Sequence, residues 1–342
     1  MSKPAEVAVI GAGALGLAAA AALARRGARV TVFDPGAYNA SLAAAGMISP
    51  AFEAALEDAS PRTAALYARA ADRWPEAAAL YCVEFDRSGA AWRGPTEPLL
   101  TRMRALGFEA RVTGTGLFAP GEGTVDPAQA CDRFAAAVTA GGGAFVRGRA
   151  ERLAASPGGV EVTAAGESWR GDAVVVAAGW RAEGLAVPGL EPLLARVSPI
   201  KGQICRLAGG GAALVQEVVR APGVYVVPRG GEVLVGATME AGRSDSVAEP
   251  EVVERLRRAA VDAVPELGDA VVEGAWAGVR GASPDGLPMV GATALPRVFA
   301  ALAPRRNGWL FAPLVGRMVA DLVMGEDPGA DAEVLRTDRF DP

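Results

Sequence analysis

The first 34 residues carry the pattern that most restricts what this chain can fold into. The β-branched stretch VAVI at residues 7–10 predicts a short buried strand, and residues 15–26 predict a helix that ends at Gly27. The stretch ARVTVFD that follows predicts a second strand, which ends at Asp34. A strand, a helix and a second strand in this order predict a βαβ unit.

Three glycines in a GxGxxG spacing occupy the turn between the first strand and the helix: Gly11, Gly13 and Gly16. The first permits a tight turn, the second lets a pyrophosphate approach bare backbone, and the third lets the helix pack on the strand. The helix N-terminus offers N–H donors to phosphates, and Asp34 accepts hydrogen bonds from a ribose. A glycine-rich turn without a nucleotide is disfavoured, because all parts of the pattern occur together. The sequence predicts a dinucleotide site but does not separate NAD from FAD. The predicted site also includes Ala12, Ala14, Leu15 and Pro35.

Residues 7–24 carry no charge, so a transmembrane helix is an alternative interpretation of the same stretch. Its glycines and alanines disfavour this alternative, because alanine contributes little to membrane insertion. A signal peptide is also disfavoured, because the acid Glu6 directly precedes the apolar run and a basic segment is lacking there. We therefore expect no membrane span.

Composition excludes several classes of function. The formal net charge of −5 and the lack of a basic stripe argue against nucleic-acid binding. The sequence holds no histidine, which excludes Ser-His-Asp hydrolases, His-ligated zinc sites and imidazole acid–base catalysis. The three cysteines, Cys82, Cys131 and Cys205, are far apart and form no CxxC pair. We expect no metal site, no disulfide and a reducing, cytoplasmic location.

Two later segments are rich in small residues. The stretch SLAAAGM at residues 41–47 follows the first βαβ unit, and AVVVAAG at residues 173–179 predicts a buried strand ending in a turn at Ala178 and Gly179. Small residues let the backbone approach a large flat ligand closely. For residues 41–47, a helix N-terminus packed in the core remains an alternative.

The other segments predict a mixture of helices and antiparallel strands. Residues 60–79 predict an alanine-rich helix, Asp126 and Pro127 begin another that ends at the glycines 141–143, and residues 160–172 predict a hairpin. KGQICRL, VYVVPR and EVLVGATM, within residues 201–239, predict an antiparallel sheet. Residues 252–267 predict an amphipathic helix, and RRNGWLFAP predicts a glycine turn followed by an apolar helix.

Taken in order, seven blocks of the sequence carry a family resemblance: VAVIGAGALGL, SLAAAGM, VDP, VVVAAG, YVVPRGGEVLVGATM, WAGVRGASPDGLPMVG and RNGWLFAP. The chain resembles the D-amino-acid oxidase family of FAD-dependent oxidoreductases and, within it, the glycine oxidases associated with thiamin biosynthesis. The resemblance implies FAD as the cofactor, bound without a covalent link. It implies an α/β fold of the two-domain α+β type, in which a Rossmann-like FAD-binding domain is interleaved with an antiparallel-sheet substrate domain. The expected FAD-binding domain comprises residues 1–50, 124–195 and 285–342, and the substrate-binding domain comprises residues 51–123 and 196–284.

The same resemblance implies roles for individual residues. Arg280 is expected to grip the carboxylate of an amino-acid substrate, Tyr225 to share that task, and Met239 and Arg306 to line the same pocket. A guanidinium fork suits a carboxylate, where lysine would supply only a point charge. The residues expected to contact FAD beyond the first βαβ unit are Ser41, Ala44, Ala45, Gly46, Met47, Ala150, Ala178, Gly179, Arg280, Arg306, Asn307, Gly308, Trp309 and Leu310. A salt bridge for Arg280 and core packing for Tyr225 remain the alternatives.

The sequence departs from the family at two positions near the expected site. Pro304 and Arg305 stand where a histidine often precedes the RNG block, and Gly281 stands where a proline often follows the pocket arginine. Both departures concern the substrate and the reaction with oxygen rather than flavin binding.

The expected reaction is oxidative deamination of a small amino acid or amine: glycine, sarcosine or a D-amino acid. Hydride transfer from the substrate to flavin N5 would give an imino acid, which water converts to a keto acid and ammonia, and molecular oxygen would be reduced to hydrogen peroxide. A neutral amine needs no protein base, which suits a chain without histidine. Two alternatives stay open: a dehydrogenase with a different electron acceptor, and a catalytically silent flavin-binding subunit. The sequence also leaves open whether the chain forms a homo-oligomer.

Overall fold

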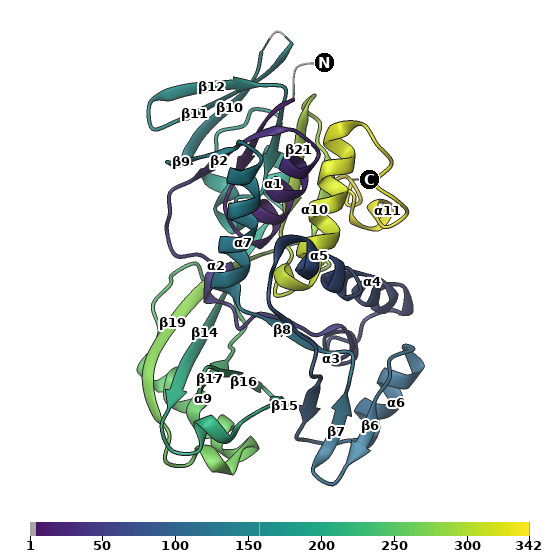
Figure 1. The fold of residues 1–342 in the computed structure, drawn as a ribbon, viewed down its shortest axis with the longest axis vertical. Helices are drawn as coiled ribbons and strands as arrows, with labels where there is room; N and C mark the ends of the chain where they lie inside the picture. The colour runs from purple at the N-terminus through teal and green to yellow at the C-terminus, as the bar shows by residue number, and fades with distance from the viewer. Residues whose placement is uncertain (1–4, 157, 342) are drawn as a thin grey trace.

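A six-stranded sheet forms the upper part of the molecule in Figure 1. The computed structural model describes residues 5–156 and 158–341. The strands of this sheet span Glu6–Ile10 (β1), Arg29–Asp34 (β2), Ala144–Arg147 (β9), Ala173–Val176 (β13), Met289–Ala292 (β20) and Val298–Leu302 (β21). Their order is β20-β21-β13-β1-β2-β9. β1 pairs in parallel with β2 and β13, and β20 is an antiparallel edge strand. The predicted βαβ unit is therefore confirmed.

Both faces of this sheet are covered. Successive side chains of a strand point to opposite faces, so they pack into two different cores. In β1, Val7 and Val9 pack into one core, whereas Ala8 and Ile10 pack into the other. The first core lies under helices, which span Ala14–Arg25 (α1), Pro61–Ala71 (α4), Trp74–Tyr81 (α5), Pro127–Ala140 (α7) and Gly308–Met324 (α10). The second core lies under an antiparallel sheet of Ala150–Ser156 (β10), Gly159–Ala164 (β11) and Glu167–Gly171 (β12). Strands β11 and β12 form the predicted hairpin.

One predicted helix is divided in two. Residues 60–79 fold as α4 and α5 rather than as one helix. Pro75 explains the break, because proline has no N–H for an intrahelical bond and fits only the first turn of a helix. The predicted helix over residues 252–267 is also shorter than expected. It ends at Ala263 and is followed by a 3₁₀ turn that begins at Pro265.

A nine-stranded, mostly antiparallel sheet forms the lower part of the molecule (Figure 1). Its strands span Ala90–Trp92 (β5), Arg111–Thr113 (β6), Gly116–Ala119 (β7), Ser198–Ala208 (β14), Val218–Ala221 (β15), Val224–Arg229 (β16), Glu232–Gly236 (β17), Glu240–Ala241 (β18) and Val271–Ala282 (β19). β15 pairs in parallel with β5, which joins two segments that lie far apart in the sequence. The helix α9 (Pro250–Ala263) packs on one face through Val252, Val253, Leu256 and Ala260.

The remaining elements of the described residues are short helices, 3₁₀ turns and strands. These elements span Ala40–Ala43 (α2), Met47–Ile48 (β3), Pro50–Leu56 (α3), Phe85–Asp86 (β4), Glu97–Ala105 (α6), Gly123–Val125 (β8), Gly179–Gly184 (η1), Glu191–Leu194 (α8), Ala212–Leu214 (η2), Pro265–Leu267 (η3) and Ala332–Leu335 (α11). The six-stranded sheet takes strands from residues 6–34, 144–176 and 289–302, and the large sheet from residues 90–119 and 198–282. The expected interleaved α/β fold is confirmed, and the domain boundaries given above remain our proposal.

Candidate active site

The glycine turn between β1 and α1 is packed so closely that side chains would not fit. Gly11 has a φ of +109°, and a Cβ there would lie 2.4 Å from the carbonyl oxygen of Ala177. A Cβ on Gly16 would lie 2.0 Å from the carbonyl oxygen of Gly11. The turn therefore brings the N-terminus of α1 directly against the end of β13, as the GxGxxG spacing predicts.

Asp34 and Ser41 are both bonded to the start of α1. The Asp34 carboxylate accepts the N–H of Ala12 at 2.8 Å and that of Gly36 at 2.7 Å. The Ser41 hydroxyl accepts the N–H of Ala14 at 2.9 Å. Each carboxylate oxygen of Asp34 keeps a second lone pair that is free for a ribose hydroxyl.

A continuous cleft of about 230 Å³ runs from this turn to the start of α10. We call it the nucleotide cleft. The residues expected in the site that line it are Gly11, Gly13, Ala14, Leu15, Asp34, Pro35, Ser41, Ala44, Ala150, Ala178, Gly179, Arg280, Arg306, Gly308 and Trp309. Parts of the chain that are far apart in the sequence thus meet along one groove.

A larger space of about 1040 Å³, the central cavity, lies between the cleft and the large sheet. The residues expected in the site that line it are Ala44, Ala45, Gly46, Met47, Tyr225, Met239, Arg280, Arg306, Asn307 and Trp309. Six residues line both spaces and define their junction: Ala40, Ala44, Gly278, Arg280, Arg306 and Trp309.

Three expected residues line neither space. Ala12 contributes its N–H to Asp34, and Gly16 lies beneath Gly11. Leu310 is 1% exposed and packs in the core under the six-stranded sheet. Their direct contact with a cofactor remains a prediction, whereas their part in shaping the turn and α10 is visible in the packing.

Arg280 extends from β19 over the neighbouring strand at a position without a side chain. A Cβ on Gly202 of β14 would lie only 2.1 Å from the Nη1 atom of Arg280. The guanidinium donates to the carbonyl oxygen of Thr238 at 3.3 Å, and no carboxylate of the described residues forms an ion pair with it. Burial lowers the pKa of Arg280, with the neighbouring Tyr225 opposing the shift. The result is a partly buried cation at the junction that lacks an anionic partner.

Tyr225 lies on β16 near Arg280, and its pKa is raised because burial outweighs the effect of that arginine. Met239, 37% exposed, lies beyond the end of β17 at the rim of the central cavity. Together with Arg306, these side chains make up the four that the sequence analysis assigns to the substrate pocket, and all four line the central cavity.

Arg306 has partners that the sequence analysis did not identify. Its Nε atom is bonded to the Glu53 carboxylate, and its Nη1 atom lies 3.1 Å from a carboxylate oxygen of Glu57. Burial alone would raise the pKa of Glu53, but Arg306 and Arg220 outweigh it and hold that pKa below its ordinary value. The charge of Arg306 is therefore balanced within the protein, unlike that of Arg280.

A second buried group lies beside this one. Arg220 donates to the Ser49 hydroxyl at 2.8 Å and to Glu53 at 3.0 Å, and Ser49 is also bonded to Glu122. Glu122 is 1% exposed and accepts the N–H of Ala51 at 2.8 Å. Burial raises its pKa to about 7. The sequence signal for these residues is weak: a single acid in the alanine-rich stretch PAFEAAL and a single arginine in an apolar strand.

The two departures from the family pattern are in contact. The N–H of Arg305 donates to the carbonyl oxygen of Gly281 at 2.9 Å, and Pro304 forms an isolated bridge with Ala282. A Cβ on Gly281 would lie 3.0 Å from the backbone nitrogen of Trp180. The two positions therefore pack against each other, and both line the nucleotide cleft.

The residues present fit FAD. The cleft offers a helix N-terminus and a carboxylate at one end, and at the other end it opens at Arg280 and Trp309 into the central cavity. Trp309 is fixed there by donating its indole N–H to the carbonyl oxygen of Ser41 at 3.0 Å. Among the residues described, no cysteine lines either space, so no thiol is available for a covalent link. The described helices include none with the length and apolar character needed to cross a membrane.

Comparisons with known proteins agree with this geometry. A family model described as FAD dependent oxidoreductase matches residues 6–322. The glycine oxidase of Geobacillus kaustophilus (strain HTA426) is 32% identical over 360 aligned residues, covering 95% of this chain and 94% of that protein. The crystal structure of glycine oxidase from Geobacillus kaustophilus superposes with a TM-score of 0.88 at 26% identity, covering 100% of both chains. A D-amino acid dehydrogenase of Methylobacterium sp. (strain 4-46) is 35% identical over 236 residues, 64% of this chain and 54% of that protein. The chain therefore belongs to the DAO family of FAD-dependent oxidoreductases, and FAD is its cofactor.

Proposed function

We propose that the chain oxidises the amine of a small amino acid, namely glycine, sarcosine or a D-amino acid. The product imine is hydrolysed by water to a keto acid and ammonia, or to a keto acid and an amine when the substrate is N-substituted. The observation that carries the proposal is Arg280, a cation at the junction of the two spaces that pairs with no carboxylate in the part of the chain that the structure describes. The similarity to a glycine oxidase over nearly the whole chain supports the same reaction class.

In this proposal the side chains bind and orient the substrate. Two N–H groups of Arg280 hold the carboxylate, and the hydroxyl of Tyr225 shares it. A carboxylate fixed at the junction keeps the rest of a small amino acid beside Trp309 and Ala44, which line both spaces. Fixing the orientation in this way supplies a large part of the acceleration, because it removes rotational and translational freedom before the reaction.

FAD, when bound in the nucleotide cleft, supplies the two-electron acceptor for a hydride from the substrate α-carbon. No protein base is needed once the substrate amine has lost its extra proton. The absence of histidine from the sequence is therefore compatible with the reaction. The central cavity, at about 1040 Å³, is larger than glycine requires, so sarcosine and D-amino acids remain in the proposed substrate class.

We propose molecular oxygen as the final electron acceptor, with hydrogen peroxide as its product. A dehydrogenase is the second candidate, favoured by the D-amino acid dehydrogenase similarity and by Pro304 and Arg305 in place of a histidine. Oxygen consumption and peroxide formation with glycine, sarcosine and D-alanine support an oxidase. Bleaching of the flavin by substrate, with dye reduction but no peroxide, supports a dehydrogenase. A flavin that no substrate bleaches supports a silent flavin-binding subunit.

Replacement of Arg280 tests the proposed carboxylate site. Arg280→Ala is expected to keep its FAD and to lose at least about 30-fold in kcat/KM, which corresponds to about 2 kcal/mol for a buried charge pair that has lost one member. Steady-state kinetics and the flavin content of the purified protein are the measurements. Normal kinetics in this variant would place the carboxylate site elsewhere.

A matched arginine provides the control. Arg258 on α9 is exposed, and within the residues described its ion pair is with Glu254, four residues earlier. Arg258→Ala removes an arginine that lines neither space, so its kcat/KM and flavin content are expected to equal those of the wild type.

A further inference from the structure

Lys201 is a charged side chain that the proposed reaction does not use, yet it is completely buried at 0% exposure. It lies on β14 next to Gly202, the position over which Arg280 extends. Because side chains alternate along a strand, Lys201 and Gln203 point to the face of the sheet opposite Arg280. Burying a lysine without partners would be strongly unfavourable. The segment that supplies the partners of Lys201 is therefore the segment that Lys201 holds in place.

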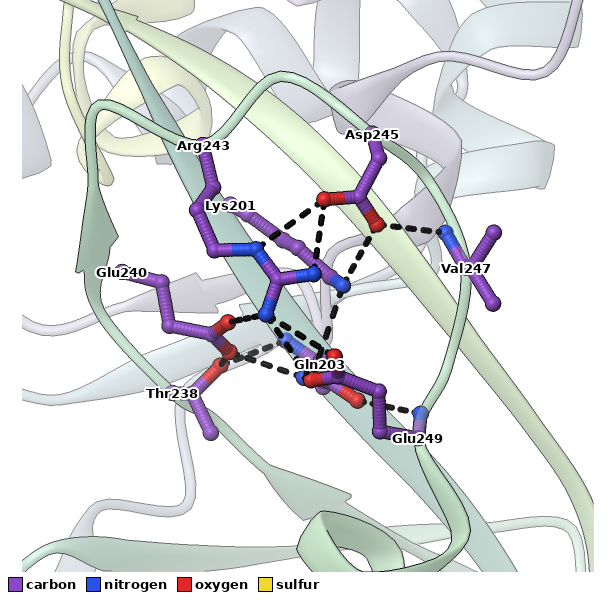
Figure 2. Close-up of polar contacts among 8 residues, drawn as sticks. All are labelled: Lys201, Gln203, Thr238, Glu240, Arg243, Asp245, Val247 and Glu249. Atoms are coloured by element: carbon purple, nitrogen blue, oxygen red, sulfur yellow. Dashed lines mark hydrogen bonds and ion pairs between the residues drawn. The ribbon is translucent and has the colours of Figure 1, made fainter.

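The partners of Lys201 come from the segment of residues 238–249, which connects β17 to α9 (Figure 2). Its Nζ atom donates to Asp245 at 2.6 Å and lies 3.7 Å from Glu249. Arg243 forms ion pairs with Asp245 at 2.8 Å and Glu249 at 2.9 Å. Hydrogen bonds from Lys201 hold the pKa of Asp245 at about 2, so this carboxylate is ionised near neutral pH.

Gln203, also 0% exposed, uses its whole side-chain amide in the same network. Its Nε2 atom donates to Glu240 at 2.9 Å and to Glu249 at 2.7 Å, and its Oε1 atom accepts the N–H of Glu249 at 2.7 Å. Figure 2 shows Gln203 and Arg243 between the three carboxylates. A fully bonded buried amide tolerates little displacement, because any shift leaves a buried donor or acceptor unpaired.

Thr238 connects this network to the candidate active site. Its hydroxyl accepts the backbone N–H of Gln203 at 2.9 Å and donates to Glu240, and its own N–H donates to the carbonyl oxygen of Gln203 at 3.3 Å. On the cavity side, the carbonyl oxygen of Thr238 accepts the Nη1 hydrogen of Arg280 at 3.3 Å. This is the one hydrogen bond to a protein group that the Arg280 guanidinium makes within the described residues.

We infer that Thr238 is a positioning residue that orients the Arg280 guanidinium, and that the network anchored by Lys201 and Gln203 holds Thr238 in place. This inference rests on the proposed function, in which Arg280 binds the substrate carboxylate. The network lies on one face of β14 and the binding arginine on the other, and the backbone of Thr238 joins them. Loosening the network frees Arg280 to take other rotamers, so carboxylate binding weakens before the chemistry of a bound substrate changes.

A matched pair of substitutions at Thr238 tests the inference. Thr238→Val keeps the shape of the side chain and removes the hydroxyl, whereas Thr238→Ser keeps the hydroxyl. The holoenzyme is titrated with acetate, which has a carboxylate but no amine, and binding is followed by the flavin absorption spectrum. KM, kcat and the melting temperature are measured on the same proteins, together with Lys201→Met and Arg280→Ala.

We expect Thr238→Val to raise both the acetate Kd and KM by about 3- to 10-fold, the usual effect of one lost hydrogen bond, with kcat changed less than about 2-fold. Thr238→Ser is expected to restore wild-type values, and Lys201→Met to change binding in the same direction as Thr238→Val. If Lys201→Met does not fold, the two Thr238 variants still decide the question.

A purely structural role predicts a different result. In that case Thr238→Val lowers the melting temperature but leaves the acetate Kd and KM at wild-type values, which overturns the inference. If Arg280→Ala does not weaken acetate binding, the carboxylate site itself is misplaced, and the inference fails together with the proposed function. If the wild type oxidises none of the proposed substrates but binds acetate through Arg280 and Thr238, the proposed reaction fails and the positioning role stands.

Discussion

The packing around Gly16 leaves no room in the nucleotide turn for one additional carbon atom. A Cβ at this position would lie 2.0 Å from a backbone oxygen of Gly11, which is tied to β2 by its own N–H at 2.9 Å to the carbonyl oxygen of Phe33. Neither backbone segment can move without disturbing a buried parallel strand. The third glycine of the motif is therefore required by packing, before any contact with a phosphate is considered.

At this residue scale, Gly16→Ala is expected to lower the free energy of unfolding by about 1–3 kcal/mol through overpacking, and to reduce the FAD retained on purification. Urea unfolding and the flavin absorbance per protein measure both effects. Gly114→Ala is the control, because a Cβ there meets no atom within 4 Å and its φ is not positive. Equal stability of the two variants would contradict the packing argument.

The helix α10 carries the turn at the flavin end of the cleft, and its first turns contain a proline. Pro313 has no N–H, so the carbonyl oxygen of Trp309, four residues earlier, receives no helical hydrogen bond. The indole N–H of Trp74 in α5 donates to this oxygen at 2.9 Å. A side chain from another helix thus completes the hydrogen bonding of α10 where Trp309 faces both spaces.

At the scale of elements, Trp74→Phe is expected to destabilise the protein by about 1–3 kcal/mol from the unpaired buried carbonyl, in addition to the smaller volume of the ring. Pro313→Ala in the same background restores an N–H for Trp309 and is expected to recover part of the loss. Urea unfolding of the single and double variants measures the coupling. Strictly additive effects would show that the Trp74 hydrogen bond is unimportant for α10.

At the scale of the whole molecule, buried charged side chains join connecting segments to the large sheet. Glu122 and Ser49 belong to the connecting segments and Arg220 to the large sheet, and hydrogen bonds join all three. Burial raises the pKa of Glu122 from 4.5 to about 7 in the folded state. Below pH 4.5 the carboxyl is protonated in both states, so its ionisation does not affect the free energy of unfolding. Between pH 4.5 and about 7 the unfolded state loses the proton first, so the free energy of unfolding falls as pH rises, and above about pH 7 this loss stays constant.

Glu122→Gln removes this ionisation and keeps an oxygen acceptor for the Ala51 N–H, while its amide N–H₂ replaces the carboxylate oxygen that accepts the Ser49 hydroxyl. We expect its free energy of unfolding, relative to the wild type, to increase between about pH 5 and about pH 8 by up to about 3 kcal/mol. Urea unfolding of both holoproteins at these two pH values measures the difference. A difference independent of pH would mean that Glu122 does not titrate in this range.

Much of the fold could be predicted because its local patterns agree with its tertiary structure. The glycine spacing, the Asp126 cap of α7 and the alternating strands from Lys201 onward each determine the backbone over a few residues. The hydrophobic period was less informative for α4 and α5, since alanine suits one long helix or two short ones. There Pro75 decided the outcome.

The candidate site was predictable only where a residue sits in a local motif. Arg280, Tyr225 and Asp34 stand in motifs that carry the family resemblance, and the structure brings them to one cleft and one cavity. Glu53, Arg220 and Glu122 lie in no such motif. Their pairing joins residues that lie 73 to 171 positions apart along the chain, and the local sequence pattern does not encode such contacts.

The sequence by itself determined the nucleotide turn, because a steric requirement for glycine and the capping of a helix act over neighbouring residues. Only the tertiary structure decided which charges are balanced and which are available. Arg280 and Arg306 are equivalent cations in the sequence, yet Arg306 is paired with Glu53 and Glu57, while Arg280 donates to the carbonyl oxygen of Thr238 and pairs with no carboxylate among the described residues. Electrostatic pairing depends on distances in space, and these are set by how the two sheets pack around the cavity.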